Sequence, residues 1–238
     1  MSFEIRDGER VTINPPSYFR AVNAIVWKDL SAEFRSRELL SAMGAFALLV
    51  ILIFNFSLEL DARTRVTVTS GVLWVTFIFA GTLGLNRSMA VEQERGCMDG
   101  LLLTPVDRSV IFFGKAIGNL IFMLIVEIII LPVYSILYNT NLFNPGLILV
   151  ILLGSVGYAA LGTLLASIAV HTRTRDIMLP ILLFPLVFPI LMPAVRASSF
   201  FLQAYEMEFI WPQLNLLIVF DVIYITLSYM LFDFVVEE

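Results

Sequence analysis

The chain is poor in the residues on which most enzyme sites depend. Its 238 residues include one cysteine and one histidine, which excludes an internal disulfide and a paired cysteine or histidine metal site. It also has no CxxC pair and no phosphate-binding loop ending in Gly-Lys-Ser/Thr. We interpret Cys97 as a small structural residue and His171 as a polar residue at a helix end. The sequence therefore predicts no catalytic residue, no metal site and no directly bound cofactor.

Charged residues are scarce as well. Asp, Glu, Lys and Arg make up 15% of the chain and leave a net charge of -5. This balance argues against nucleic acid as a partner, because phosphate backbones require clustered basic residues. Hydrophobic residues reach 59%, with 20 phenylalanines, and the mean hydropathy is +0.89. A soluble protein of this size carries more charge, so the composition predicts an integral membrane protein.

Six apolar stretches reach the length of about 20 residues that a membrane-spanning helix needs. They cover residues 39–60, 67–86, 110–138, 145–170, 176–195 and 213–235. A cytoplasmic N-terminus would leave only Arg63, Arg65 and Arg196 outside and all other basic residues inside. The sequence thus predicts an all-α polytopic membrane protein, with residues 38–238 as one six-helix domain and both termini in the cytoplasm.

The segments outside the spans are short. Residues 1–16 form a polar leader, and residues 17–37 place apolar side chains on one stripe of a helix, namely Phe19, Val22, Val26, Leu30 and Phe34. This pattern predicts an amphipathic helix in the membrane interface. A cytosolic helix packed on a partner is the alternative. Residues 196–211 are rich in aromatic residues, which predicts a short amphipathic helix at the outer interface. The alternative is a lid that faces the substrate.

Two acidic residues fall inside predicted spans. Glu127 lies near the middle of the third span and Asp221 lies within the sixth. A buried ionisable group there costs several kcal/mol unless it faces protein, water or a partner, so both are candidates for function. The alternative is a protonated carboxyl group that is hydrogen-bonded to Tyr134, to Tyr224 or to a neighbouring helix. We expect Glu127→Gln to impair function more than Asp221→Asn.

The fourth and fifth spans carry patterns that affect helix packing. The fifth contains four prolines at intervals of four or five residues, Pro180, Pro185, Pro189 and Pro193. Each removes a backbone hydrogen bond, which predicts either a moving hinge or a fixed curve. The fourth contains a ridge of small residues that lets another helix approach closely, Ser155, Ala159, Thr163 and Ser167. Gly114 and Gly118 form one GxxxG motif, which is weak evidence on its own.

A charged segment from residue 87 to residue 115 separates the second and third spans. It includes the run EQERGCMDGLLLTPVDRSVIFFGK, which starts at Glu92. Gly96 and Gly100 allow sharp turns, and Asp107 can cap a helix start, so a short helix can protrude from the membrane and return. An ordinary charged loop is the alternative.

This segment resembles the signature of type-2 ABC exporter permeases. The resemblance rests on Glu94-Arg95-Gly96, on LLLTP at residues 101–105 and on Gly114-Lys115. In that family the segment is a coupling helix that docks into a groove of a separate ATPase subunit. The resemblance implies that the ATPase contacts come from Glu92, Glu94, Arg95, Gly96, Asp99, Leu102 and Pro105.

Within that group, nearly the whole chain is similar to the CcmB family of haem exporter permease subunits in cytochrome c maturation. Three blocks carry the likeness, WKDLSAEFRSRELLSAMGAFALL, GVLWVTFIFAGTLGLNRSMAVEQERGCMDGLLLTPVDRSVIFFGK and RDIMLPILLFPLVFPIL. The likeness implies a bacterial inner membrane protein and a homodimer that works with a CcmA-like ATPase. It also implies CcmC-like and CcmD-like membrane partners and a CcmE-like haem chaperone. The leader of residues 1–16 is longer and more acidic than the family implies.

In this interpretation the partner subunit hydrolyses ATP, and haem is the transported species or is handled through release of haem-loaded chaperone. No histidine or methionine pair stands out as a set of axial haem ligands. Two alternatives remain. The chain could be a type-2 ABC exporter permease for a lipid, drug or polysaccharide, or a membrane scaffold that uses no ATP.

Overall fold

The computed structural model describes residues 3–4, 10–11, 17–57, 62–94, 97–102, 104, 106–170, 172 and 174–235. Within these ranges the chain forms the helices α1 (Tyr18–Ser36), α2 (Glu38–Ser57), α3 (Ala62–Glu94), α4 (Cys97–Leu102), α5 (Arg108–Tyr138), α6 (Pro145–Ala169), α7 (Arg175–Leu202) and α8 (Met207–Val235). Two short strands, β1 (Phe3–Glu4) and β2 (Arg10–Val11), pair in antiparallel fashion near the N-terminus. The prediction of an all-α protein is confirmed.

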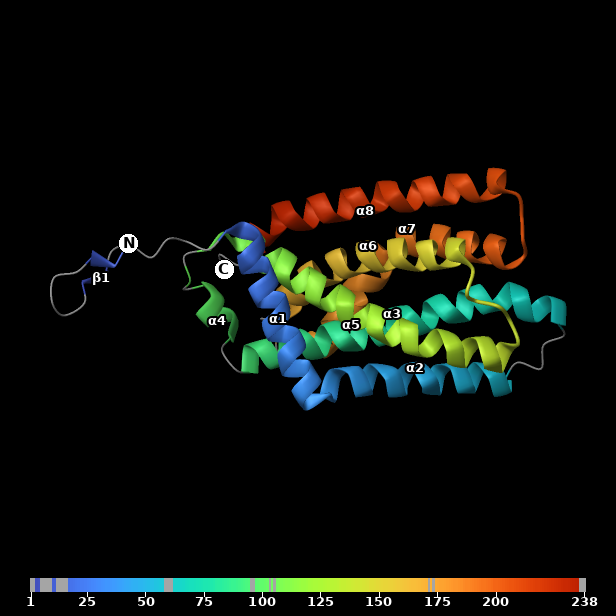
Figure 1. Ribbon diagram of the computed structural model, residues 1–238, viewed down its shortest axis with the longest axis horizontal. Coiled ribbons are helices and arrows are strands. Elements are labelled where there is room, and N and C mark those ends of the chain that lie inside the picture. Colours follow the sequence, from blue (N-terminus) through green and yellow to red (C-terminus); the bar gives the residue numbers. More distant parts are fainter. Residues whose placement is uncertain are drawn as a thin grey trace.

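Six of the described helices are long and apolar enough to cross a membrane, namely α2, α3, α5, α6, α7 and α8. They run roughly along the long axis of the molecule, whereas α1 crosses one end of the bundle (Figure 1). Below, this end is called the α1 end. The helix α4 lies at the same end, and the connections between α5 and α6 and between α7 and α8 lie at the other (Figure 1). The chain is a multi-pass membrane protein.

The helices α3 and α6 form the centre of the bundle. In each of them 72% of the apolar span is buried, compared with 22% in α2. The helix α6 packs on α5, α7 and α8, and α3 packs on α2, α5 and α7. Peripheral helices turn large apolar side chains such as Ile53, Phe56 and Val222 outward. This exposed apolar surface suits a lipid environment rather than water.

The small-residue ridge of α6 faces α5. The Asn119 amide donates to the Thr163 hydroxyl at 3.0 Å, and the Ser155 hydroxyl donates to Glu127 at 2.7 Å. From the first pair to the second, the chain advances eight residues along α5 and goes back eight along α6. The two helices therefore pack antiparallel in a fixed register, and the predicted close approach along the ridge is confirmed.

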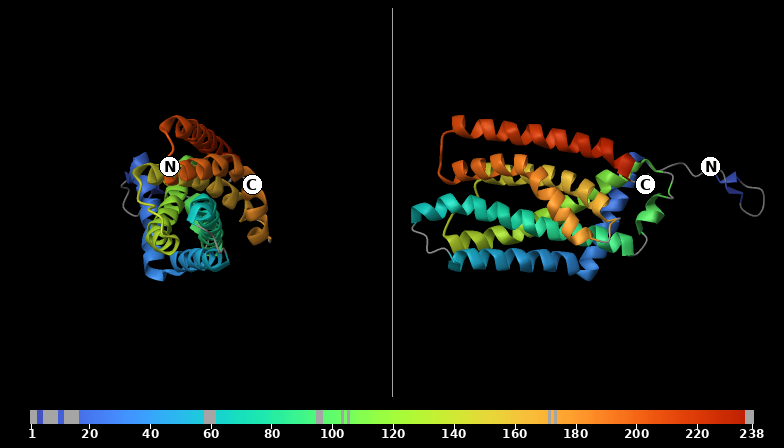
Figure 2. Two further views of the ribbon diagram at one scale, coloured as in Figure 1. Left: turned by 90° about the vertical axis from the view of Figure 1, so that its right-hand side faces the viewer. Right: turned by 180° about the vertical axis from the view of Figure 1, so that it is seen from behind.

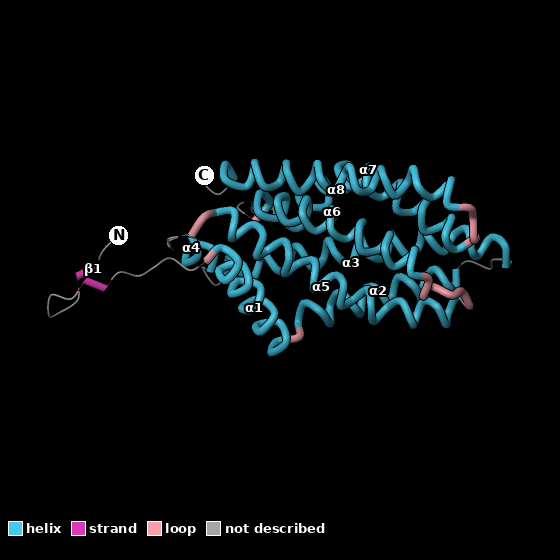
Figure 3. The backbone as a smooth tube through the Cα atoms, turned by 45° about the horizontal axis from the view of Figure 1, so that its top comes forward, coloured by secondary structure: helices cyan, strands magenta, loops and turns pink. Residues whose placement is uncertain are grey.

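A buried carboxylate fixes the corner between α1 and α2. Arg37 takes a left-handed conformation there, with a φ of 56°. The Glu33 side chain accepts a hydrogen bond from the backbone N–H of Leu40 at 2.9 Å and another from the Ser36 hydroxyl at 3.3 Å. These bonds satisfy a backbone donor in the first turn of α2. The result is a sharp corner that joins α1 directly to the bundle (Figure 3).

The helix α7 is continuous through all four prolines and follows a bent path (Figure 2). The Tyr224 hydroxyl of α8 donates to the backbone carbonyl of Leu186, which lies next to Pro185. This bond ties α8 to the bent part of α7. Motion of this bend, with Pro180, Pro185, Pro189 and Pro193 as the hinge, stays a prediction.

The separate amphipathic helix predicted for residues 196–211 is wrong. Instead, α7 continues to Leu202 and α8 begins at Met207, so only residues 203–206 connect them. Packing explains the difference. Ala194, Ala197 and Ser198 are fully buried, and the Trp74 indole of α3 donates to the Ser198 hydroxyl at 2.9 Å. These contacts hold the last turns of α7 against the bundle.

Candidate functional site

The predicted short helix between the second and third spans is present as α4, at the α1 end of the bundle. Its C-terminal turn is closed by Thr104, whose backbone N–H and hydroxyl both donate to the Leu101 carbonyl. Asp107 occupies the N-cap position of α5 but makes no side-chain capping bond. Its predicted capping role is therefore wrong. Gly100, Thr104 and Asp107 are exposed, so this connection offers an accessible surface.

The predicted ATPase contacts fall in three different places. Glu94 is exposed on the last turn of α3, and Asp99 and Leu102 belong to α4. The remaining predicted contacts Arg95, Gly96 and Pro105 lie outside the described residues. Glu92 differs from the others, because it is 8% exposed and its carboxylate forms ion pairs inside the bundle. The structure thus separates Glu92 from the exposed part of the segment.

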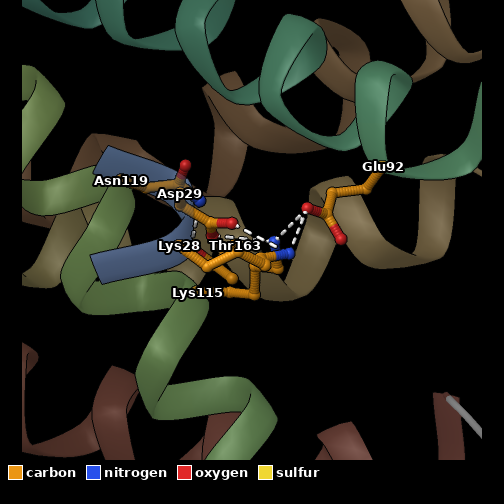
Figure 4. A network of polar contacts seen from close by, with 6 residues as sticks. All are labelled: Lys28, Asp29, Glu92, Lys115, Asn119 and Thr163. Atoms are coloured by element: carbon orange, nitrogen blue, oxygen red, sulfur yellow. Dashed lines mark hydrogen bonds and ion pairs between the residues drawn. The ribbon is translucent and has the colours of Figure 1, made fainter. Parts of the chain in front are cut away.

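Glu92 belongs to a ring of four charged side chains, called here the charge ring: Lys28, Asp29, Glu92 and Lys115. The Lys115 ammonium lies 2.8 Å from Asp29 and 2.7 Å from Glu92. The Lys28 ammonium lies 3.0 Å from Asp29 and 2.8 Å from Glu92. Each lysine thus contacts both carboxylates (Figure 4). The ring joins α1, α3 and α5 at the α1 end.

The charge ring is neutral in sum and partly shielded from water. The Lys115 side chain is 1% exposed, and those of Asp29 and Glu92 are each 11% exposed. Burial alone would lower the pKa of Lys28, but the hydrogen bond to Glu92 and the charges of Asp29 and Glu92 outweigh it. The pKa of Lys28 is therefore raised above its ordinary value. A buried ion is tolerated only when its partners are present, so the four side chains depend on one another.

The GxxxG motif explains how α1 comes close enough to form the charge ring. A Cβ atom on Gly114 would lie 2.7 Å from the Ile25 side chain of α1. A Cβ atom on Gly118 would lie 3.7 Å from a carboxylate oxygen of Asp29. Lys115 follows Gly114 directly and reaches Asp29 across this contact. The helix α1 therefore packs on α5 at this motif.

We expect Gly114→Ala to displace α1, because the added methyl group would overlap the branched Cβ of Ile25. The cost should be about 1–3 kcal/mol, as for other overpacked contacts. Gly71→Ala in α3 is the matched control, since no atom lies within 4 Å of its added Cβ. Unfolding of both variants in detergent, followed by circular dichroism, measures the difference. Equal stability of the two variants would contradict the close contact between α1 and α5.

The two intramembrane acids flank α6. Glu127 is 1% exposed and accepts from Ser155, whereas Asp221 is 5% exposed and lies against the backbone of Gly157. Of the local partners considered from the sequence, Tyr134 donates to the Thr69 carbonyl instead and Tyr224 to that of Leu186. The partner of Glu127 therefore comes from a neighbouring helix. Neither oxygen of Asp221 has a hydrogen-bond partner among the described residues.

The expectation that Glu127→Gln impairs function more than Asp221→Asn stays a prediction, now with a geometric basis. The Glu127 carboxyl group links α5 to α6 through Ser155, and Glu127→Gln replaces its second oxygen with an amide donor at this contact between two helices. Asp221 makes no such bond within the described part of the chain. The effect is measured as the function that each variant restores in a host lacking this protein, with both variants present at equal levels in the membrane. Equal activity of the two variants would contradict the prediction and would indicate that both acids serve packing alone.

Sequence reasoning missed three members of the charge ring. Lys28 and Lys115 helped to orient the chain and Lys115 was part of the family resemblance, but neither was considered as an ion-pair partner, and Asp29 was not considered. A signal was nevertheless present, because Lys115 lies in the otherwise apolar run that begins at Val110. A lysine there must find a carboxylate or reach the interface. The partner itself could not be identified, since Asp29 lies 86 residues away along the chain.

The geometry allows mechanical coupling between α4 and α1. Among the described residues, no group of three or more His, Cys, Asp or Glu side chains could hold a metal ion. The short helix α4 lies between α3 and α5 in the chain, with residues 95–96 before it and residues 103–107 after it. These are the two helices that the charge ring joins to α1. A force applied at α4 would therefore reach α1 through ionic contacts.

Comparisons with known proteins identify a family and several relatives. Residues 20–237 match the family described as CcmB protein. The chain is similar to "Heme exporter protein B" of Rhodobacter capsulatus, with 26% identity over 173 residues, which cover 71% of this chain and 78% of the relative. The protein of the same name from Pseudomonas aeruginosa is 25% identical over 170 residues (71% and 76%). That from Bradyrhizobium diazoefficiens is 23% identical over 180 residues (75% and 81%).

Proposed function

Because this chain belongs to the CcmB protein family, we propose that it is the membrane-spanning permease subunit of an ATP-driven ABC complex in cytochrome c maturation. The relatives are named as heme exporters. Haem is therefore the species that the complex transports, or that it handles by driving release of a haem-loaded chaperone. The observation that carries the proposal is the short helix α4 at one end of the bundle, between two spanning helices.

The proposal assigns ATP hydrolysis to a partner. The sequence carries no phosphate-binding loop of its own, which supports a separate CcmA-like ATPase subunit. This ATPase docks on α4 and on the exposed last turn of α3 around Glu94. The α1 end then faces the cytoplasm of a bacterial cell, and the bundle lies in the inner membrane with both termini inside. The excess of basic residues on that side supports this orientation.

The charge ring connects the proposed docking site to α1, so movement caused by docking can be transmitted into the bundle. Glu92 lies two residues before α3 ends at Glu94, and Lys115 lies seven residues after α5 begins at Arg108. Movement of α4 would shift both side chains together. Because Asp29 and Lys28 contact them directly, α1 would follow. In the complex, two copies of this chain act with two ATPase subunits, CcmC-like and CcmD-like membrane proteins and a CcmE-like haem chaperone.

Complementation tests the proposed function. A bacterial host that lacks its own copy of this gene is examined for mature c-type cytochromes by haem staining, with and without the chain restored. We expect the cytochromes to disappear in the deletion and to return with the chain. Unchanged cytochromes in the deletion host would contradict the role in cytochrome maturation. They would favour a type-2 ABC exporter permease for a lipid, drug or polysaccharide.

A further inference from the structure

Both acidic residues of α1 and its single lysine take part in contacts with the bundle, whereas its arginines are exposed. Its two acidic residues, Asp29 and Glu33, face the bundle, where Asp29 contacts Lys115 and Glu33 holds the corner to α2. Val22 and Val26 face the same side and are buried. The single apolar stripe predicted for this helix is therefore divided, because half of it packs on the bundle while Phe19 and Phe34 are exposed.

The exposed part of α1 combines aromatic and basic side chains. Phe19 is 83% exposed, Trp27 is 71% exposed and Phe34 is 57% exposed. Arg20 and Arg35 are also exposed, and exposed Arg37 follows at the corner. None of these three arginines forms an ion pair with another described residue. We call these six residues the outer face of α1. Within the described part of the chain no acidic side chain pairs with these arginines, since the two acids of the helix point inward.

The position of α1 along α5 places this outer face at the edge of the membrane. Ile25 and Asp29 contact α5 at Gly114 and Gly118, six and ten residues after α5 begins at Arg108. With 31 residues, α5 is ~46 Å long, whereas the hydrocarbon core is ~30 Å thick. The excess length extends beyond the core. Shared between the two ends, the excess is ~8 Å at each, so contacts about 9–15 Å from the start of α5 lie in the outermost part of the hydrocarbon core, next to the lipid headgroups.

We propose that the outer face of α1 binds anionic phospholipid in the leaflet at the α1 end. The guanidinium groups of Arg20, Arg35 and Arg37 contact headgroup phosphates, for which their planar donor geometry is suited. Phe19, Trp27 and Phe34 enter the boundary between headgroups and acyl chains. A zwitterionic lipid offers the same phosphate but also a cationic group. The positive charge of the face therefore selects lipids with a net negative charge.

The tryptophans of the chain provide a local test. Trp27 lies on the outer face of α1, whereas Trp211 is exposed near the start of α8 at the opposite end, and Trp74 is buried. The full chain is reconstituted in vesicles with a fixed ratio of phosphatidylglycerol to phosphatidylcholine. Bromine, which quenches tryptophan on contact, is placed on one lipid or the other. The Trp211→Phe protein then reports on Trp27, and the Trp27→Phe protein reports on Trp211.

We expect brominated phosphatidylglycerol to quench Trp27 more strongly than brominated phosphatidylcholine after correction for mole fraction. An enrichment of roughly fivefold corresponds to the attraction of one basic residue at an anionic surface. The preference should be lost in a triple variant, Arg20→Gln, Arg35→Gln and Arg37→Asn. Asparagine is chosen at residue 37 because it tolerates the left-handed conformation there. Unchanged Trp211 quenching in the triple variant shows that the bundle is intact.

Three results would overturn the proposal. Equal quenching of Trp27 by the two brominated lipids would show that α1 does not select anionic lipid. A preference that survives the triple variant would show that the arginines are not its cause. Absence of quenching by either lipid would show that protein, rather than membrane, covers the outer face.

Discussion

Replacing Lys115 with methionine should lower the free energy of unfolding by about 3–5 kcal/mol, the range for removing one partner of a buried ion pair. Lys115 is the most buried member of the charge ring, with a side chain that is 1% exposed. Its loss leaves Asp29 and Glu92 with Lys28 alone. One carboxylate charge then remains uncompensated in a partly shielded site. We expect α1 to separate from α5 before the rest of the bundle unfolds.

Two further variants distinguish loss of charge balance from loss of packing. Lys115→Met combined with Glu92→Gln removes one charge of each sign and leaves the 3.0 Å pair between Lys28 and Asp29. This double variant should recover most of the lost stability. Arg108→Met, two turns earlier on α5, is the control. It removes a partly exposed arginine that donates to the Asp233 carbonyl at 3.1 Å, and should change stability by less than about 1.5 kcal/mol. Denaturant unfolding in mixed micelles measures all three. If Lys115→Met is as stable as Arg108→Met, the charge ring does not hold α1.

Reversing two charges at α4 should abolish association with the ATPase subunit. Glu94→Lys together with Asp99→Lys changes the exposed turn of α3 and the helix α4, where the proposed docking occurs. Like charges brought together at an interface weaken binding by several kcal/mol, on the order of a hundredfold or more. Co-purification of the ATPase with this chain measures the loss. Membrane insertion should be unchanged, because neither residue lies in the apolar part of a span.

The control for this experiment lies at the opposite end of the bundle. Glu206→Lys together with Glu208→Lys reverses two exposed charges there and should leave ATPase association intact. Glu92 is omitted from the reversal, because its replacement would break the charge ring as well as alter the segment. If the Glu94 and Asp99 variant retains the ATPase as fully as the control does, docking at α4 is contradicted.

The membrane-spanning helices could be predicted because length and composition decide them. The third and fourth predicted spans, 110–138 and 145–170, agree closely with α5 (Arg108–Tyr138) and α6 (Pro145–Ala169). The prediction was wrong where tertiary packing extends a helix, as at residues 196–211. There the hydrogen bond between Trp74 and Ser198 depends on two residues 124 positions apart. A pattern read along one segment contains no information about such a contact.

The site was only partly predictable for the same reason. A short helix between the second and third spans followed from glycines and charges close together in the sequence. The burial of Glu92 did not, because a glutamate in a charged segment has the same local pattern whether it faces water or a lysine. Its partner Lys28 lies 64 residues away. Likewise, the GxxxG motif indicates close helix approach, but it does not identify α1 as the helix that approaches.

Cross-linking from α4 tests the central claim of this account most directly, namely that α4 is the docking point for the ATPase. In a Cys97→Ser background, a cysteine replaces exposed Gly100 of α4, and a second protein carries Glu208→Cys at the opposite end. Each is expressed with the ATPase subunit and treated with a short cross-linker that joins thiols to amines. The account predicts an adduct with the ATPase from Gly100→Cys alone. The absence of this adduct, or equal adducts from both positions, would contradict it.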